Sequence, residues 1–418
     1  MKTEALLHTS TKSFSFKRKV LIILSLVILL LMICVSLFSE RTAYAEDKNK
    51  SKESIASDLA NAIDEVMDRL HIDSLQQFID SLGGEEKSFL SADNLKYVLK
   101  QLSNGESGNY FEKLFNLLGS TFGRYFLSFL PSFITILIVC ILKSILSGMT
   151  SDFLDNSTTE VVHIVVYAAI ITILMTGVVG IIGTVVGTIN SLSSFSEAVF
   201  PVVLTLLSSV GGATTVAAFT PMLAVLSVGI TSIIVKIIVP AFIGTIVFSV
   251  VGNLSKSVKL EKLTHLIKTA ATWLIGVVFG LFAAFLTAHG ITGGVVDKFG
   301  FNVAKFALSG YVPILGGYLS DGFDLISASI VIVKNSFGYF SAITLIAIVV
   351  FPLLKVMAFS LALRFVAAII EPIGDERVSK LLHSVAENMN LLITALAGVG
   401  FLFFIMIMLM LGSCNMGI

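Results

Sequence analysis

Asp321 and Asp324 are the two acidic residues whose spacing could most readily carry chemistry, because side chains three positions apart can share one helix face. They lie in GYVPILGGYLSDGFD, residues 310–324, inside a chain that is otherwise strongly apolar. Intramembrane aspartyl proteases pair two aspartates but require a GxGD element, which YLSDGFD lacks. The adjacent Gly322 also argues against a regular helix at this point. A proteolytic role is therefore not expected.

Other residue types that carry chemistry are scattered. The six histidines form no HExxH motif, and the sequence contains no GxxxxGK[ST] phosphate loop and no GxSxG nucleophile elbow. The three cysteines, Cys34, Cys140 and Cys414, show no paired spacing that would indicate a disulfide framework or a zinc site. We therefore expect a protein that is not an enzyme and has no cofactor, no metal and no catalytic residue.

Composition indicates the environment of the chain. Of its 418 residues, 55% are hydrophobic and only 13% are charged, about half the charged share of a typical soluble domain. Such a chain is typical of an all-α, polytopic helical membrane protein whose main partner is the lipid bilayer. The formal net charge is zero, so nothing suggests nucleic-acid binding.

The N-terminus resembles a secretory signal peptide, assigned to residues 1–45. The basic KRK at 17–19 precedes an apolar run from Val20 to Phe38, and Ala43 and Ala45 form an A-x-A cleavage pattern. Because the apolar run is long, an uncleaved anchor is the alternative. In either case the chain from Glu46 onward is expected to be extracytoplasmic.

Residues 46–123 differ in kind from the apolar remainder of the chain. They hold 14 of the 28 acidic residues, and their apolar residues recur at helical spacing in three stripes. The pattern predicts three or four short amphipathic helices. Either these helices form a small bundle that packs on itself, or they make a docking platform for another exported protein.

Residues 124–412 are predicted to be a polytopic transmembrane domain, with a short C-terminal tail at 413–418. Residues 216–252 would reach about 55 Å as one helix, so a turn or kink is expected between Lys236 and Pro240. The run 339–370, with Pro352 and Lys355 at its middle, raises the same problem, whereas 323–333 is too short to span alone.

Orientation depends on how the apolar runs are divided. The segment 255–268 holds four lysines against one glutamate, so the positive-inside rule places it in the cytoplasm. That requires an odd number of crossings before it. The number is odd if residues 197–252 cross the membrane three times after two earlier crossings. It is even if residues 197–212 form only a re-entrant segment. The sequence leaves both open.

Charges and glycines inside the apolar runs are candidate contact points. Lys143 and Lys334 are expected to snorkel from helix ends, whereas Lys236, Lys355, Arg364 and Glu371 are candidates for charges buried in the protein. Arg364 and Glu371 are seven apart and would share a helix face. Small residues let helices approach closely, so the glycine row at 177, 180, 183 and 187 and the pair Gly276 and Gly280 predict helix packing, within the chain or between copies.

Two Gly/Pro-interrupted stretches complete the candidate site. Pro313, Gly316 and Gly317 predict a non-helical elbow or re-entrant loop whose aspartates, Asp321 and Asp324, face water or a partner. Gly211 and Gly212 interrupt the stretch 196–223 in the same way. Broken helices in both halves of a membrane protein point to a transporter-like site. Physical reasoning alone leaves two classes open: a permease with a mid-membrane site, or a structural membrane component whose elbows shape an assembly.

A family resemblance adds information to these patterns. The segment 291–338, ITGGVVDKFGFNVAKFALSGYVPILGGYLSDGFDLISASIVIVKNSFG, resembles the signature region of the stage III sporulation protein AE family. SSVGGATT at 208–215 and EPIGDERV at 371–378 are similar to that family too, as is the layout of signal peptide, exported segment and polytopic domain.

The resemblance implies a mother-cell protein of endospore-forming bacteria, in the membrane that surrounds the forespore. Its relatives belong to a secretion-like channel complex between mother cell and forespore. The implied partners are the other stage III sporulation A-operon membrane proteins and, indirectly, stage II sporulation protein Q of the forespore. The family has no established catalytic residues, so none are expected here.

Overall fold

The computed structural model describes residues 61–67, 70, 72–90, 95–103, 109–150, 156–254, 260–311, 316–373 and 376–412. The chain divides into two compact units, Met1–Asp58 and Leu59–Ile418, and every described residue lies in the second. Within these ranges all regular structure is helical, with no strand. The prediction of an all-α fold is confirmed.

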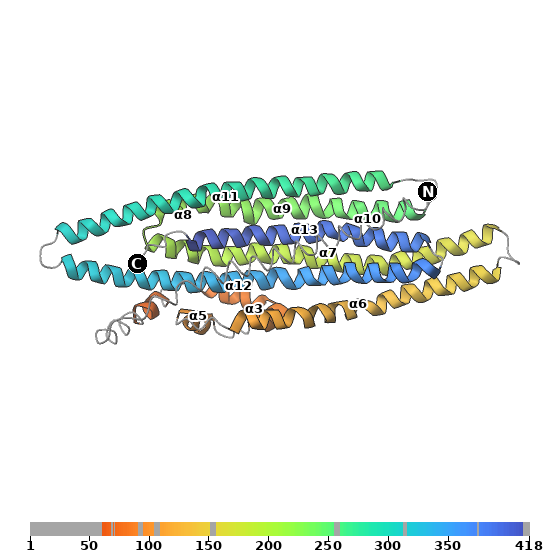
Figure 1. The fold of residues 1–418 in the computed structure, drawn as a ribbon, viewed down its shortest axis with the longest axis horizontal. Coiled ribbons are helices and arrows are strands. Elements are labelled where there is room, and N and C mark those ends of the chain that lie inside the picture. Colours follow the sequence, from red (N-terminus) through yellow and green to blue (C-terminus); the bar gives the residue numbers. More distant parts are fainter. Residues whose placement is uncertain are drawn as a thin grey trace, which may run out of the picture. The chain divides into compact units, whose positions relative to one another are not determined.

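Three short helices precede the long ones (Figure 1). They are α3 (Asp73–Ser81), α4 (Gly84–Leu90) and α5 (Leu95–Ser103). The long helices, which Figure 1 shows running side by side, are α6 (Asn109–Thr150), α7 (Asn156–Ser209), α11 (Glu261–Tyr311), α12 (Gly316–Ile370) and α13 (Glu376–Gly412), together with a composite helix between α7 and α11. A 3₁₀ turn, η4 (Glu371–Ile373), follows α12.

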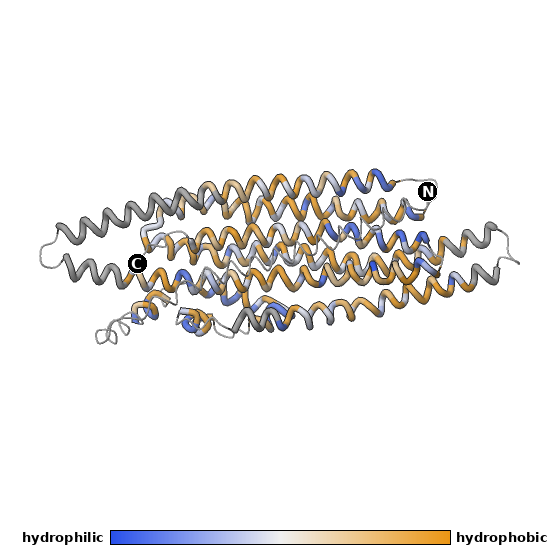
Figure 2. The backbone as a smooth tube through the Cα atoms, in the orientation of Figure 1, coloured by the Kyte–Doolittle hydropathy of each residue, from blue (hydrophilic) through white to orange (hydrophobic). Residues whose placement is uncertain are grey.

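Six helical segments of the described chain are long and apolar enough to cross a membrane, so this is a multi-pass membrane protein. Figure 2 shows how their apolar residues continue along almost the whole of each described helix. The segments are Asn116–Ile145, Ile164–Ser209, Ala213–Leu254, Glu261–Leu286, Ile326–Ile373 and Glu376–Gly412.

The core of the bundle is formed by α12 and α13, which pack on each other; α12 also packs on α6 and α7. In the most apolar part of α12, 83% of residues are buried inside the protein, against 17% in α6. The apolar character of α12 therefore comes from protein packing more than from contact with lipid, whereas α6 lies at the periphery.

The sequence predicted a turn or a kink between Lys236 and Pro240, and the composite helix excludes the turn. Residues 213–254 do not turn between Lys236 and Pro240 but continue as α8 (Ala213–Ala224), η2 (Val225–Ile230), α9 (Thr231–Ile233), η3 (Ile234–Ile238) and α10 (Val239–Leu254). η2 and η3 are π-helical. Pro240 has no N–H to bond the carbonyl of Lys236, and the wider π turns before it accommodate that loss without ending the helix.

Other predicted breaks are also absent. The run 197–212 is not a separate segment: up to Ser209 it is the last part of one long helix, α7, which contains Pro201. The short run 323–333 and the run 339–370 both belong to α12, which contains Gly322 and Pro352. Residue 123, the expected end of the exported region, lies inside α6. Helices too long for one span were expected to break because every apolar residue was taken to lie within the hydrocarbon core, and this is wrong.

Candidate functional site: a platform of short helices beside a lateral pocket

The platform, defined as α3, α4 and α5, covers part of the long-helix bundle. α3 packs on α7, while α4 and α5 pack on α12. Phe78 of α3 meets Phe195 with ring centroids 5.4 Å apart, and Phe89 of α4 meets Phe351 at 6.1 Å. These contacts arise because the apolar face of each amphipathic helix must be buried, and helices this short are not stable in water alone.

Hydrogen bonds tie the platform together. The backbone N–H of Leu95 donates to Oε1 of Gln76 at 3.0 Å, which links α5 to α3. Lys100 of α5 forms an ion pair with Asp64 at 2.8 Å. The described short helices therefore pack on one another and on the long-helix bundle of the same chain. Docking of another exported protein stays a prediction.

A second ion pair joins the platform to α6. Glu85 of α4 accepts a hydrogen bond from Arg124 at 2.9 Å. The neighbouring Glu86 is half-buried, and burial raises the pKa of its carboxyl above the ordinary value. The charge of Glu85 raises that pKa further, while the Lys355 ammonium opposes the shift. Two carboxylates and two cations thus meet where the platform, α6 and α12 come together.

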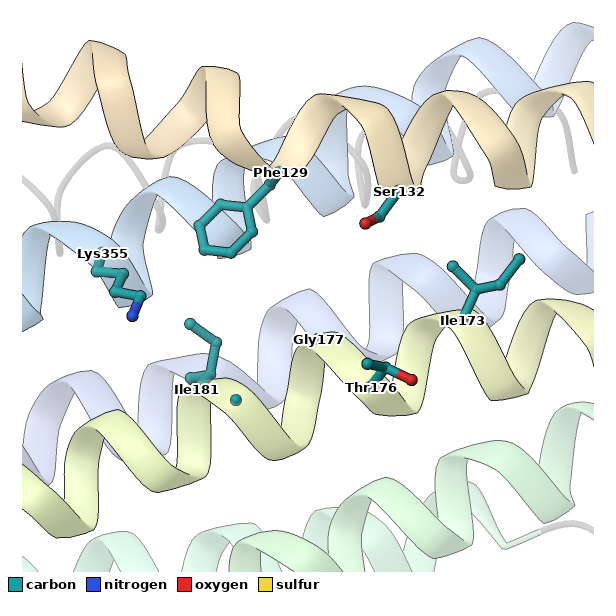
Figure 3. Close-up of a pocket in the computed structure, with 8 residues that line it drawn as sticks. Phe129, Ser132, Ile173, Thr176, Gly177, Ile181 and Lys355 are labelled. Atoms are coloured by element: carbon teal, nitrogen blue, oxygen red, sulfur yellow. The ribbon is translucent and has the colours of Figure 1, made fainter.

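A pocket of about 420 Å³ lies between α6, α7 and α12 (Figure 3). Figure 3 shows the side chain of Phe129 projecting from α6 into the space between the helices, and the side chain of Lys355 projecting from α12 toward α7. The lining residues are Phe129, Ser132, Ile173, Thr176, Gly177, Gly180, Ile181 and Lys355. An apolar wall with two hydroxyls and one ammonium can hold an apolar group that carries a negative charge or a hydrogen-bond acceptor.

The pocket wall depends on one glycine. A Cβ at Gly177 would lie 2.7 Å from the ring of Phe359, so this ring packs directly on the backbone of α7. Phe359 also stacks edge-on against Phe129 at 5.0 Å. The predicted glycine packing holds only here. Gly180, Gly183 and Gly187 are exposed, and no atom outside their own helix backbone lies within 4 Å of a Cβ built on them; the same is true of Gly276 and Gly280.

No histidine, cysteine or carboxylate lines the pocket. Among the described residues, no group of three or more His, Cys, Asp or Glu side chains is placed to hold a metal ion. The arrangement is suited to binding and packing.

Gly211 and Gly212 form the turn between α7 and α8. Gly211 has φ of +80°, in the left-handed region. Its N–H donates to the carbonyl of Ser208 at 3.0 Å, and the N–H of Gly212 donates to the carbonyl of Leu207 at 2.9 Å. This pair of bonds is a Schellman motif, which satisfies the last carbonyls of α7 and needs glycine at the left-handed position.

The stretch 310–324 is more helical than predicted. α11 ends at Tyr311 and α12 begins at Gly316, so Gly316 and Gly317 are helical and the non-helical elbow does not include them. Asp321 and Asp324 lie in the first turns of α12, but the surroundings of their side chains, and Pro313 altogether, lie outside the described residues. A partner contact by these residues stays a prediction.

The four candidate buried charges have different environments. Lys236 is exposed and Lys355 is half-buried at the pocket. Arg364 is half-buried, and its electrostatic partner is Glu387 of α13. Glu371 is exposed in η4, beyond the end of α12, so the expected shared helix face with Arg364 is not formed.

Lys334 was expected to snorkel, and this is wrong. Its side chain is fully buried, and its ammonium donates to the carbonyl of Leu411 at 3.0 Å, in the last turn of α13. The last carbonyls of a helix lack intrahelical donors, and the negative end of the helix dipole favours a cation. A lone lysine in an apolar run gave no sign that the end of another helix would bind it.

Sequence reasoning also missed two polar clusters. Asn388 of α13 donates to Ser249 of α10 at 3.1 Å, and Ser384 donates to the same hydroxyl at 2.9 Å. A second cluster joins η2 of the composite helix to α7. The hydroxyls of Ser227 and Ser196 form a hydrogen bond of 2.6 Å, and the backbone carbonyl of Ser227 accepts a hydrogen bond from the Ser193 hydroxyl at 3.0 Å. A signal was present, since Ser384 and Asn388 are spaced i, i+4 on one helix face.

Comparison with known families decides the identity of the chain. The stage III sporulation protein AE family matches residues 93–414, which is most of the sequence and includes α5 through α13. The chain belongs to this family. The resemblance noted in the segment 291–338 is thereby confirmed, and the family assignment implies a role in sporulation.

One curated relative is similar over a shorter stretch. It is "Stage III sporulation protein AE" of Bacillus subtilis (strain 168), 25% identical over 264 residues. The match spans 63% of this chain and 66% of that relative, just under two thirds of its length. No solved structure matches.

Proposed function

We propose that this protein is a non-enzymatic integral membrane component of the mother cell–forespore channel, a secretion-like complex required for endospore formation. It would lie in the mother-cell membrane around the forespore. The observation that carries the proposal is the platform, whose helices bury their apolar faces on membrane helices and keep charged faces outward. A multi-pass protein that carries such a platform is suited to binding other proteins. Membership of the family indicates a role in sporulation.

The helix count supports an extracytoplasmic platform. If the chain before α6 is exported, then α6, α7 and the composite helix make three crossings and bring residues 255–260 to the cytoplasm. The lysine-rich segment 255–268 then obeys the positive-inside rule. On the same count the turn at Gly211 would lie on the exported side.

Tyr97 is the contact we expect a partner to use. Among the described residues before α6 it is the one large apolar side chain with high exposure, 62%. It is flanked on α5 by the exposed Lys96 and Lys100. Exposed tyrosines are frequent anchors of protein interfaces. The expected partners are the other stage III sporulation A-operon membrane proteins and, through them, stage II sporulation protein Q.

The test is co-purification from sporulating cells. A tagged Tyr97→Glu chain should recover less of the stage III A-operon membrane proteins than the unsubstituted chain, and sporulation should fall. Gln77→Glu, on the exposed face of α3, is the matched control and should change neither. If Tyr97→Glu recovers the full set of partners and sporulates normally, α5 does not provide the docking surface.

A transporter with a mid-membrane site is the second candidate function. The π-helical segments η2 and η3 and the hydroxyl cluster at Ser193, Ser196 and Ser227 favour it, because π turns often mark functional sites. Purified chain in vesicles discriminates the two functions. Solute uptake without partner proteins, abolished by Ser227→Ala, would support the transporter over the structural component.

A further inference from the structure

The helices of this bundle are far longer than a bilayer requires. α7 has 54 residues, about 80 Å at ~1.5 Å per residue. A hydrocarbon core is about 30 Å thick, and even a strongly tilted helix needs only modestly more length. A large part of α7 must therefore lie outside the hydrocarbon, and its exposed residues indicate which part.

The exposed face of α7 changes character near its middle. From Val161 to Val179 it is mainly apolar, with Val165 and Val179 more than 60% exposed. Beyond Gly187 the exposed residues are mostly polar; they are Asn190, Ser194, Glu197, Pro201, Thr205, Ser208 and Ser209. The apolar stretch rises about 28 Å, close to the thickness of a hydrocarbon core.

α6 changes at the same level. Its exposed residues are polar or small up to Arg124 and largely apolar from Leu127 to Ile145, again a rise of about 28 Å. The pocket fixes the register of the two helices, because Phe129 and Ser132 line it opposite Gly177 and Gly180. The two transitions therefore lie side by side.

The outer faces of the platform helices indicate independently which part of the bundle lies outside the hydrocarbon. α3 exposes Asp73 and Asp80, and α5 exposes Lys96 and Lys100, so neither outer face suits hydrocarbon. Phe78 packs on Phe195 within the polar-faced half of α7. The Arg124–Glu85 pair lies at the α6 transition, where headgroups would accept charged side chains.

On the other side of the bundle the apolar belt continues. α10 exposes Ile243, Val247 and Val251, and α11 exposes apolar side chains from Leu263 to Phe285. Val225 and Val228 are exposed as well, so the belt reaches further along this side than along α7. A tilt of the bundle relative to the bilayer normal accounts for the difference.

We propose that the bilayer surrounds only one half of this bundle. Lipid contacts α6 from Leu127, α7 up to about Gly180, and the exposed belts of α10 and α11. The second half of α7, together with the platform, stands in water on the platform's side of the membrane. Its polar face then contacts water, not lipid. This inference concerns lipid contact and holds whichever complex the protein joins.

A spin-label depth scan along α7 tests the proposal. The full-length chain with its three native cysteines replaced is reconstituted in phosphatidylcholine vesicles and labelled singly at Ile164, Thr172, Val179, Ser194 or Thr205. Collisions with oxygen should dominate at the first three positions, and collisions with an aqueous nickel chelate at the last two. A label at Lys96 of α5 is the aqueous control. Oxygen-dominated labels at Ser194 and Thr205, or nickel-dominated labels at Ile164 and Thr172, would overturn the proposal.

The unsubstituted protein offers a second measurement. The sequence has a single tryptophan, Trp273, which is 69% exposed within the α11 belt. Phosphatidylcholine brominated on its acyl chains should quench its fluorescence, and aqueous iodide should not. Quenching by iodide without quenching by brominated lipid would remove α11 from the belt and contradict the proposal even if a labelled variant misfolded.

Discussion

Glu86 shows how a single half-buried carboxyl can make the platform sensitive to pH. Burial raises its pKa most and the charge of Glu85 adds to the shift, while a backbone hydrogen bond and the ammonium of Lys355 offset only part of it. Between the unfolded and folded pKa values, the folded protein holds a proton that the unfolded chain has lost. The free energy of unfolding therefore falls as pH rises through that window, and the loss is complete above the folded pKa.

Glu86→Gln is predicted to remove this loss. The variant should show a higher thermal unfolding midpoint than the unsubstituted chain at pH 7, and nearly the same midpoint at pH 4, where Glu86 is mostly protonated in both states. Thermal unfolding in detergent between pH 4 and pH 8 measures the effect. Glu85→Gln is the neighbouring control: breaking the ion pair with Arg124 should cost up to about 1 kcal/mol at pH 7, and losing the repulsion of Glu86 offsets part of that cost. Equal midpoints for Glu86→Gln and the unsubstituted chain at pH 7 would contradict the prediction.

The sequence was a better guide to which residue types occur at the site than to which residues contact one another. The charge-poor helices could be read from the sequence, and Lys355, a predicted buried charge, is half-buried at the pocket. The partner of Lys334 could not, because Leu411 lies 77 positions away and contributes only a backbone carbonyl. Likewise, a Cβ at Gly338 would overlap the side chain of Leu411, while a Cβ at Gly180, Gly183 or Gly187 would meet no atom outside its own helix backbone within 4 Å. Spacing shows which residues share a face, but not what that face meets.

At the scale of elements, the turn at Gly211 separates two of the long helices. The sequence indicated a break there because adjacent glycines disfavour helix, and the structure adds the reason, a left-handed residue that closes a Schellman motif. Breaks near Pro240 and Pro352 were expected from helix length, yet the helices continue through both residues, as α7 does through Pro201. Pro201 is exposed, and near Pro240 the helix changes to π turns, so neither loss of a hydrogen bond ends the helix.

Gly211→Ala is predicted to destabilise the protein by about 1–2 kcal/mol, the cost of a left-handed conformation for an L-residue. Gly212→Ala is the neighbouring control, because φ of Gly212 is −79° and alanine adopts that value readily. Thermal unfolding of both variants in the same detergent provides the comparison. The explanation fails if the two substitutions lower the unfolding midpoint equally.

At the scale of the whole molecule, hydropathy could not distinguish lipid-facing helix from protein core. α12 is among the most apolar segments, yet most of its span is buried by α13, α6, α7 and the platform. The sequence therefore predicted the membrane class and the family correctly but divided the long helices into too many spans. Exposed residues, which only the packing reveals, separate the lipid-facing half of α7 from the half that the platform covers.

The platform and the bundle should depend on each other, and Phe89 is the residue to test. The platform helices have only seven to nine residues each, too short to persist without tertiary contacts. Phe89 is fully buried against Phe351, so Phe89→Ala should cost the docked platform about 3–5 kcal/mol. Limited proteolysis in vesicles should then cut within residues 73–103 while α6–α13 remain intact, and recovery of partner proteins should fall with it. Tyr97→Ala, at an exposed position of α5, should leave the cleavage pattern unchanged. If the Phe89→Ala chain resists protease as well as the unsubstituted chain, the platform holds its structure without the bundle, and its contacts with α12 do not control docking.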